Sequence, residues 1–202
     1  MTRTALVMVA LLALVGTARA DEDRFTVGFR GGAFIRDDRG YAEHAAVFGL
    51  DGAGLGGGGV FEGGVRVAPR LWLYASWAGF SSLATRRMEE LRVTNQALVA
   101  QAGVTAFRWE PLLAGAQVPM ALRVDVLAGG GLYTVRDELD GASHDASGPG
   151  LRAGAQATLS WRALGFTLAY GYHLSRASLD DRVGGALRAG GNEIGAGLSF
   201  GF

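Results

Sequence analysis

The chain has 202 residues, enough for one domain behind a removable leader, with no cysteine and with arginine as its only basic residue apart from three histidines. Removing Arg3 and Arg19, which lie in the leader, reduces the 19 basic residues to 17, against 19 acidic residues. No basic surplus is therefore available to drive nucleic-acid binding, and neither disulfides nor thiolate chemistry is possible.

The first twenty residues predict a secretory signal peptide. Arg3 supplies a basic start, residues 5–15 form an apolar run, and Ala18-Arg19-Ala20 reads as a small-x-small cleavage site. We expect residues 1–20 to be removed and residues 21–202 to form one domain. After Asp21 no run of ~18 apolar residues follows, which argues against a helical membrane protein.

The mature chain alternates apolar and small or polar residues with period two, the pattern of β-strands. Eight segments of about ten residues or more follow this pattern, a length suited to tilted membrane-spanning strands. The eight expected strands lie near residues 24–35, 55–67, 70–82, 93–109, 122–132, 151–161, 166–175 and 193–202. The fourth is the weakest, and Trp72, Tyr74 and Phe80 blur the faces of the third.

The expected connections alternate in length. Long charged or glycine-rich loops are predicted at residues 36–54, 83–92, 136–150 and 178–190. Short turns are predicted at Ala68-Pro69 and 162–164, with a longer connection at 110–119. Outer-membrane barrels have long external loops and short periplasmic turns, so we predict an all-β, antiparallel, up-and-down transmembrane β-barrel of about eight strands.

A soluble sandwich or lipocalin-like barrel is the main alternative. The residues opposite the apolar rows are mostly Gly, Ser, Thr and Ala, with occasional charges. A water-exposed face would be richer in charge, whereas small residues suit a narrow, filled lumen. This composition favours a barrel in a membrane.

The carboxy-terminal segment, Gly195-Ala-Gly-Leu-Ser-Phe-Gly-Phe202, resembles the last strand of outer-membrane β-barrel proteins. Length, strand rhythm and this ending together resemble the small OmpA/OmpX-like barrel family. The resemblance implies that the barrel-assembly machinery reads the terminal strand, through the row Ile194, Leu198, Phe200 and Phe202. It also implies residence in the outer membrane among lipid and lipopolysaccharide, and we expect a monomer.

An eight-stranded interior is just wide enough for side chains to fill it. The candidates for a lumen charge network are Arg30, Glu62, Arg66, Arg123, Asp125, Arg152 and Glu193. Unpaired charges would be costly there, so compensating pairs are expected, with Arg30 and Glu62 as the preferred pair. A filled interior favours a structural, envelope-stabilising or surface-interaction role through the external loops. A narrow small-solute channel is the alternative.

One cluster suggests enzymatic chemistry. His173, Ser175 and Glu193 resemble the His-x-Ser and later Glu of lipid A deacylases, in which a histidine base could activate a serine. The asparagine that follows in that family is Arg176 here, and His173 has the parity of lumen residues. We therefore expect His173 to be a hydrogen-bonded interior residue and the chain not to be an enzyme.

The remaining motifs do not predict a cofactor or a resident metal. The glycines at 52–57 lack the lysine of a phosphate-binding loop, and those at 129–131 fit close approach of neighbouring strands. Residues 137–145 carry oxygen ligands but match no established cation loop. The expected aromatic girdles consist of Trp72, Trp77, Trp109, Trp161, Tyr170 and Tyr172.

Overall fold

The computed structural model describes residues 24–36, 45–47, 49, 55–86, 89–110, 120–139, 141–179 and 187–202. The expected signal peptide, residues 1–20, lies outside the described residues. Among the residues described, no helix is long and apolar enough to cross a membrane.

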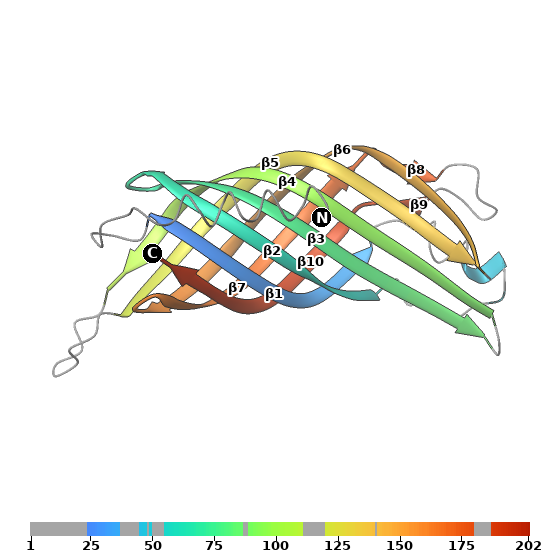
Figure 1. Ribbon diagram of the computed structural model, residues 1–202, viewed down its shortest axis with the longest axis horizontal. Coiled ribbons are helices and arrows are strands. Elements are labelled where there is room, and N and C mark those ends of the chain that lie inside the picture. Colours follow the sequence, from blue (N-terminus) through green and yellow to red (C-terminus); the bar gives the residue numbers. More distant parts are fainter. Residues whose placement is uncertain are drawn as a thin grey trace, which may run out of the picture.

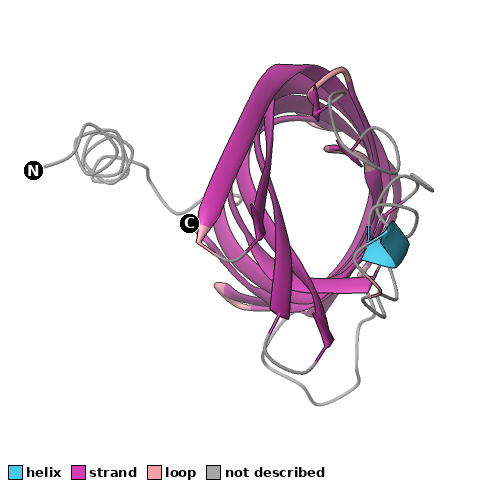
Figure 2. Cartoon of the chain, turned by 90° about the vertical axis from the view of Figure 1, so that its right-hand side faces the viewer, coloured by secondary structure: helices cyan, strands magenta, loops and turns pink. Residues whose placement is uncertain are grey.

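Within the described ranges, eight strands form a closed antiparallel barrel (Figures 1 and 2). They are β1 (Phe25–Arg36), β2 (Leu55–Ala68), β3 (Leu71–Arg86), β4 (Glu89–Trp109), β5 (Met120–Leu139), β6 (Ala142–Trp161), β7 (Leu164–Ser175) and β10 (Gly191–Gly201). Each barrel strand pairs with the next one along the chain, and β1 closes the ring on β10, where Phe29 lies opposite Leu198. The predicted up-and-down barrel is confirmed.

The two ends of the barrel differ. At the short-turn end, residues 69–70 join β2 to β3, residues 162–163 join β6 to β7, and the chain reaches Phe202 (Figure 1). The opposite end, called here the hairpin end, holds the tips of the β3–β4 and β5–β6 hairpins. Two short strands lie there as well, β8 (Ser178–Leu179) and β9 (Leu187–Arg188), which pair with each other outside the ring.

The outer face of the barrel is apolar. Large hydrophobic side chains from all eight barrel strands are about half exposed, for example Phe29 at 60%, Leu98 at 61% and Leu151 at 61%. Such a continuous apolar surface would be costly in water and matches a lipid environment. On β5 it runs from Met120 to Leu132, about 40 Å of strand, which a tilt near 45° reduces to about 30 Å across the membrane.

Beyond this belt, four strands continue as paired sheet. On the outer faces of β4, β5 and β6 the last apolar residues are Leu98, Leu132 and Pro149, which are aligned in one cross-strand row. The next outward row is polar, with Gln96, Thr134 and Ser147. We call the parts beyond the apolar row, residues 78–86, 89–97, 133–139 and 142–148, the β3–β6 extension.

The extension corrects two expected loops. Residues 83–92 belong to the β3–β4 hairpin except for 87–88, which lie outside the described residues, and residues 136–150 continue β5 and β6 around a turn at Gly141. Apart from Leu83, which is 50% exposed, the outward residues become polar there, and this loss of outward hydrophobicity is typical of a loop. Their inward partners Leu91, Val93 and Val135 are fully buried, and this one-sided burial stabilises paired strands.

The remaining two expected loops are described only in part. Within 36–54, Arg36 belongs to β1 and residues 45–47 form a helical turn, with Ala45 buried. Within 178–190, β8 and β9 are ordered as strands. Residues 37–44, 48, 50–54 and 180–186 of these loops lie outside the described residues.

The interior contains large aromatic groups as well as polar ones. Trp72 is 2% exposed and packs on Tyr74 with ring centroids 5.9 Å apart, so the prediction that Trp72 belongs to an outer girdle is wrong. Trp72 lies with the other even-numbered residues on the inward face of β3. The pairing of β3 with β2 and β4, rather than hydrophobicity, decides which face of the strand points inward. Trp77, Trp109 and Trp161 do face outward, and each is more than half exposed.

Glycines let neighbouring backbones come close. A Cβ added at Gly131 would overlap the carbonyl oxygen of Leu98, and one at Gly129 would overlap that of Ala100, both on β4. By contrast, a Cβ added at Gly57 on β2 would meet no atom within 4 Å. The expected close approach of backbone at 129–131 is confirmed.

We predict that Gly131→Ala destabilises the barrel by about 1–3 kcal/mol, because the new methyl group forces β4 and β5 apart. Gly57→Ala is the matched control and should change stability by less than about 0.5 kcal/mol. Urea unfolding in lipid vesicles, followed by heat-modifiable gel migration, measures both. Equal stability of the two variants would contradict the close approach.

Candidate functional site

All eight barrel strands send polar side chains into one connected group inside the barrel. Because side chains alternate along each strand, every strand offers one or two inward residues at this level. We call this group the lumen network; its members are Arg30, Glu62, Tyr74, Gln101, Thr105, Arg123, Asp125, Arg152, Gln156, His173 and Glu193. All of them except Arg123 are buried.

Glu193 on β10 is the residue with the most cationic neighbours. Arg152 donates to its Oε2 at 3.1 Å, and Arg30 donates to its Oε1 at 3.4 Å. His173 Nε2 lies 2.9 Å from Oε2, and because a carboxylate only accepts, this nitrogen carries the hydrogen. With 1% of its surface exposed, Glu193 is stabilised by partners from β1, β6 and β7 rather than by water.

Arg30 and Glu62, the pair preferred from the sequence, lie 3.1 Å apart between Nη1 and Oε1. Glu62 Oε2 also accepts from Gln101 Nε2 at 3.0 Å, and Gln101 Oε1 accepts from Arg152 at 2.7 Å. Since Arg152 and Arg30 both reach Glu193, these five residues form a closed ring of hydrogen bonds across the lumen.

A second cluster surrounds Asp125 on β5. Thr105 donates to it at 2.8 Å, Tyr74 donates at 3.2 Å, and Arg123 Nε lies 2.9 Å away. Gln156 connects the two clusters, because its amide nitrogen donates to Asp125 at 3.3 Å while its oxygen accepts from Arg30 at 3.4 Å.

The network is balanced in charge. Its three guanidinium groups, on Arg30, Arg123 and Arg152, match three carboxylates, on Glu62, Asp125 and Glu193. Buried charges in a barrel surrounded by lipid require such compensation, because the alternative is an uncompensated ion in a low-dielectric medium. The arrangement crosslinks the wall of the barrel and occupies its cross-section.

An apolar cluster fills the interior between the network and the hairpin end. Phe34 and Phe80 stack with centroids 4.8 Å apart, and Phe34 meets the edge of His173 at 5.8 Å. The cluster continues through Leu91, Val99 and the β9 residue Leu187, all nearly or fully buried. This apolar filling was not expected from the sequence, in which only charged residues were predicted to fill the lumen.

Arg66, the seventh predicted lumen residue, lies at the short-turn mouth of the barrel. Arg66 lines a vestibule at the short-turn end, where Arg123 also borders the opening. The other six predicted charges join the network through the contacts above. Their interior position follows from strand parity, but their exact partners depend on which strands the closed ring makes adjacent.

Because only charged residues were predicted to line the lumen, the neutral network members were missed. They are Tyr74, Gln101, Thr105 and Gln156. Gln156 has the same parity as Arg152 on β6, so alternation alone could have placed it inside. Amides and phenols can bridge a carboxylate and a guanidinium because they both donate and accept. Tyr133 extends the group, since its hydroxyl lies 3.2 Å from His173 Nδ1.

The enzyme-like cluster is not assembled for acyl transfer. Both ring nitrogens of His173 have other partners, Tyr133 and Glu193, and Ser175 Oγ instead accepts a hydrogen bond from Ala177 N at 2.9 Å. A histidine base would need a nitrogen directed at the serine oxygen. His173 is a hydrogen-bonded interior residue, as the sequence parity indicated.

The acidic hairpin at 137–145 contains a contact between His144 and Asp137. His144 Nδ1 lies 3.4 Å from Asp137, whose neighbour in the motif, Asp140, lies outside the described residues. Among the described residues, no group of three or more histidine, aspartate or glutamate side chains could hold a metal ion.

The terminal-strand row faces the membrane side of the barrel. Ile194, Leu198 and Phe200 are each slightly more than half exposed, and Phe202 is 39% exposed. Ile194, Leu198 and Phe200 lie on the outward face of β10, which pairs with β1 and β7, and Phe202 follows the end of this strand. Their role in assembly stays a prediction.

No protein-family model matches the chain. No curated protein sequence matches it either. Among solved structures, the chain is similar to Ail, the attachment invasion locus protein of Yersinia pestis, with a TM-score of 0.50, 13% identity, and coverage of 89% of this chain and 100% of that one.

Two further structures are similar with lower scores. The Neisserial surface protein A (NspA) gives a TM-score of 0.44 at 12% identity, over 88% of this chain and 96% of that one. The N-terminal β-barrel domain of OprF from Pseudomonas aeruginosa gives 0.39 at 13% identity, over 90% of this chain and 100% of that one. At this level of identity the likeness concerns the fold.

We predict that Glu193→Ala lowers the free energy of unfolding by about 3–5 kcal/mol, because it leaves Arg152, Arg30 and His173 without their shared carboxylate. The control is Glu110→Ala, which removes the exposed partner of Arg108 and should cost less than about 1 kcal/mol. Urea titration in vesicles compares them. A smaller loss for Glu193→Ala than for Glu110→Ala would refute the central role of this carboxylate.

Proposed function

We propose that this chain, which has the fold of the small eight-stranded outer-membrane β-barrels, is a closed barrel of a bacterial outer membrane that presents the β3–β6 extension for surface interaction. The observation that supports this most is the continuation of four paired strands beyond the apolar belt. In this proposal the hairpin end faces outward, and the short-turn end faces the periplasm.

The outward face of the extension has the character of a water-exposed surface. Beyond the polar row, the cross-strand neighbours are Thr94, Arg136 and Asp145, followed by Arg92, Glu138 and Ser143. Opposite charges lie side by side in each of these rows, which favours a stable sheet without a strong net field. Such a surface suits contact with a polar macromolecule better than retention in the membrane.

The inner face keeps the extension rigid. Ala84, Leu91, Val93 and Val135 are all buried in the apolar cluster, which Leu187 and Ala177 cover from the side of β8 and β9. A binding surface built on paired strands holds its side chains in fixed positions, so little ordering entropy is lost when a partner binds.

A channel is disfavoured by the filling of the lumen. The closed hydrogen-bonded ring of the network and the apolar cluster occupy successive levels of the same interior. An ion would have to displace paired charges at the first level and lose its hydration at the second.

We predict that the purified protein shows little steady conductance in planar lipid bilayers. An open porin reconstituted in parallel serves as the positive control. Large, long-lived open-channel currents from this chain would rule out the closed barrel.

The β5–β6 part of the extension can be shortened without disturbing the faces of the strands. Deleting residues 136–139 and 142–145 joins Val135 to Ala146, already a cross-strand pair, through the retained residues 140–141. Because four residues leave each strand, inward and outward faces are preserved. A deletion of residues 111–118 at the opposite end is the control.

For a surface-interaction role, a strain carrying the shortened hairpin should attach to protein-coated surfaces as weakly as a strain lacking the protein, while the control deletion attaches like wild type. Heat-modifiable migration verifies folding in each case. If instead the strain with the shortened hairpin attaches like wild type, the β5–β6 part of the extension is dispensable for attachment and its surface-interaction role is wrong.

A further inference from the structure

The short-turn end of the barrel opens into a vestibule that the proposed surface role does not use. Residues from all eight barrel strands line it, so it is the mouth of the barrel itself. Its floor includes Trp72, over which the guanidinium of Arg123 lies 4.2 Å from the ring centroid. Beneath that floor the network closes the interior.

The lining of the vestibule is basic. Four arginines border it, Arg66, Arg108, Arg123 and Arg162, and no acidic side chain is among the described residues that line it. This contrasts with the network, where three carboxylates match three guanidinium groups. The described lining of the vestibule therefore differs from the network in having arginines without carboxylates.

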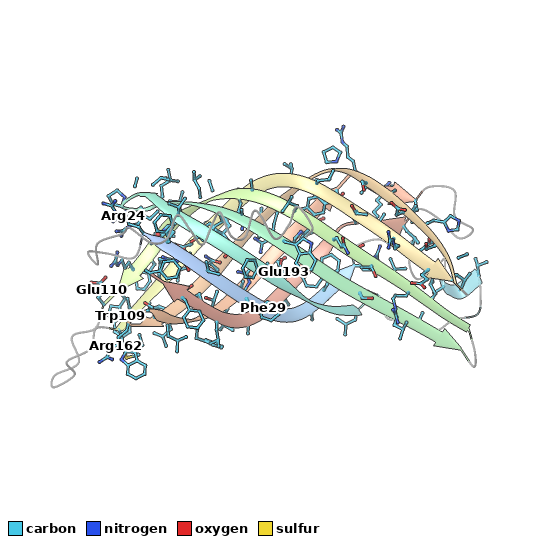
Figure 3. All side chains as sticks on the ribbon, in the orientation of Figure 1. Arg24, Phe29, Trp109, Glu110, Arg162 and Glu193 are labelled. Atoms are coloured by element: carbon cyan, nitrogen blue, oxygen red, sulfur yellow. The ribbon has the colours of Figure 1, made fainter. Side chains whose placement is uncertain are left out.

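The nearby carboxylates account for part of that charge. Asp125, beneath the floor, pairs with Arg123, and the exposed Glu110 pairs with Arg108 through Nε at 2.5 Å. Arg162, in the β6–β7 turn, makes no ion pair with any residue that the structure describes. Trp109, Glu110 and Arg162 lie together at this end in Figure 3.

The geometry and chemistry of the mouth suit an oxyanion. Guanidinium groups approach from β2, β4, β5 and the β6–β7 turn, and hydroxyls of Thr26 and Ser199 stand on β1 and β10. Donors on several sides of a mouth match a tetrahedral group, and arginine is the side chain best suited to phosphate. A cleft lined by one sign of charge also concentrates the opposite ion.

We propose that this vestibule is a binding site for a phosphate group, carried either by free phosphate or by the phosphate monoester of a headgroup-like molecule. The ligand would enter from the side of the short turns. Its oxygens would accept from Arg108 and Arg162 at the rim, with Arg66 and Arg123 deeper in the mouth.

The test is calorimetric titration of the folded, detergent-solubilised protein with inorganic phosphate and, separately, with glycerol 3-phosphate. Ionic strength is held with chloride at about 0.15 M, so that general screening is constant. We expect saturable binding of at least one, and the tighter ligand identifies the source of the phosphate group.

The variant Arg108→Gln/Arg162→Gln should bind about tenfold or more weakly, since it loses charge-assisted hydrogen bonds at exposed positions. The control is Arg24→Gln/Arg70→Gln, which makes the same charge change at exposed positions of the same end but outside the lining. The control should bind within about twofold of wild type.

A second measurement does not depend on a folded variant. Phosphate should protect Arg108 and Arg162 of the wild-type protein from phenylglyoxal, as mapped by mass spectrometry, and should leave Arg24 and Arg70 reactive. Absence of saturable binding for both ligands, equal weakening in both double variants, or equal protection of all four arginines would each overturn the proposal.

Discussion

The structure depends on one constraint: in lipid, every backbone N–H and C=O must find its partner within the protein. Closing β1 on β10 satisfies the sheet edges, and the eight strands then enclose an interior that side chains can fill. Outside, lipid contact requires an apolar surface, and Phe29, Leu98 and Leu151 are accordingly exposed. Inside, polar groups must satisfy one another. The outer belt and the lumen network are therefore two consequences of the same closure.

The interior meets its requirement in two different ways along the barrel. At mid-level, Glu193 and Glu62 are joined to Arg30 and Arg152 in a ring that leaves no carboxylate without a cation. Toward the hairpin end, Phe34 and Phe80 replace polar pairing with apolar packing. Both solutions fill the cross-section and connect distant strands. A wall crosslinked in this way is a rigid base from which the β3–β6 extension can project.

The two ends then become chemically distinct. The hairpin end carries paired opposite charges on a sheet that is buried on one face and polar on the other. The short-turn end holds a vestibule whose described lining has arginines and no carboxylate. A surface without net charge suits contact with a macromolecule, whereas a cleft of one sign suits a small anion. The closed lumen separates these ends, so each can act on its own side of the membrane.

Strand alternation by itself determined the barrel class, the outward rows such as Ile194 to Phe202, and the inward side of Arg30, Glu62 and Glu193, because period two assigns faces without knowledge of the partners. Loss of outward hydrophobicity at 83–92 and 136–150 was misread as loops, since alternation on the buried face alone is a weak signal. Only the tertiary structure decided that Trp72 points inward, that Gln101 and Gln156 complete the network, and that Arg66 lines the short-turn mouth of the barrel. Those features arise from ring closure, which brings strands distant in sequence to one level and fixes which inward side chains meet.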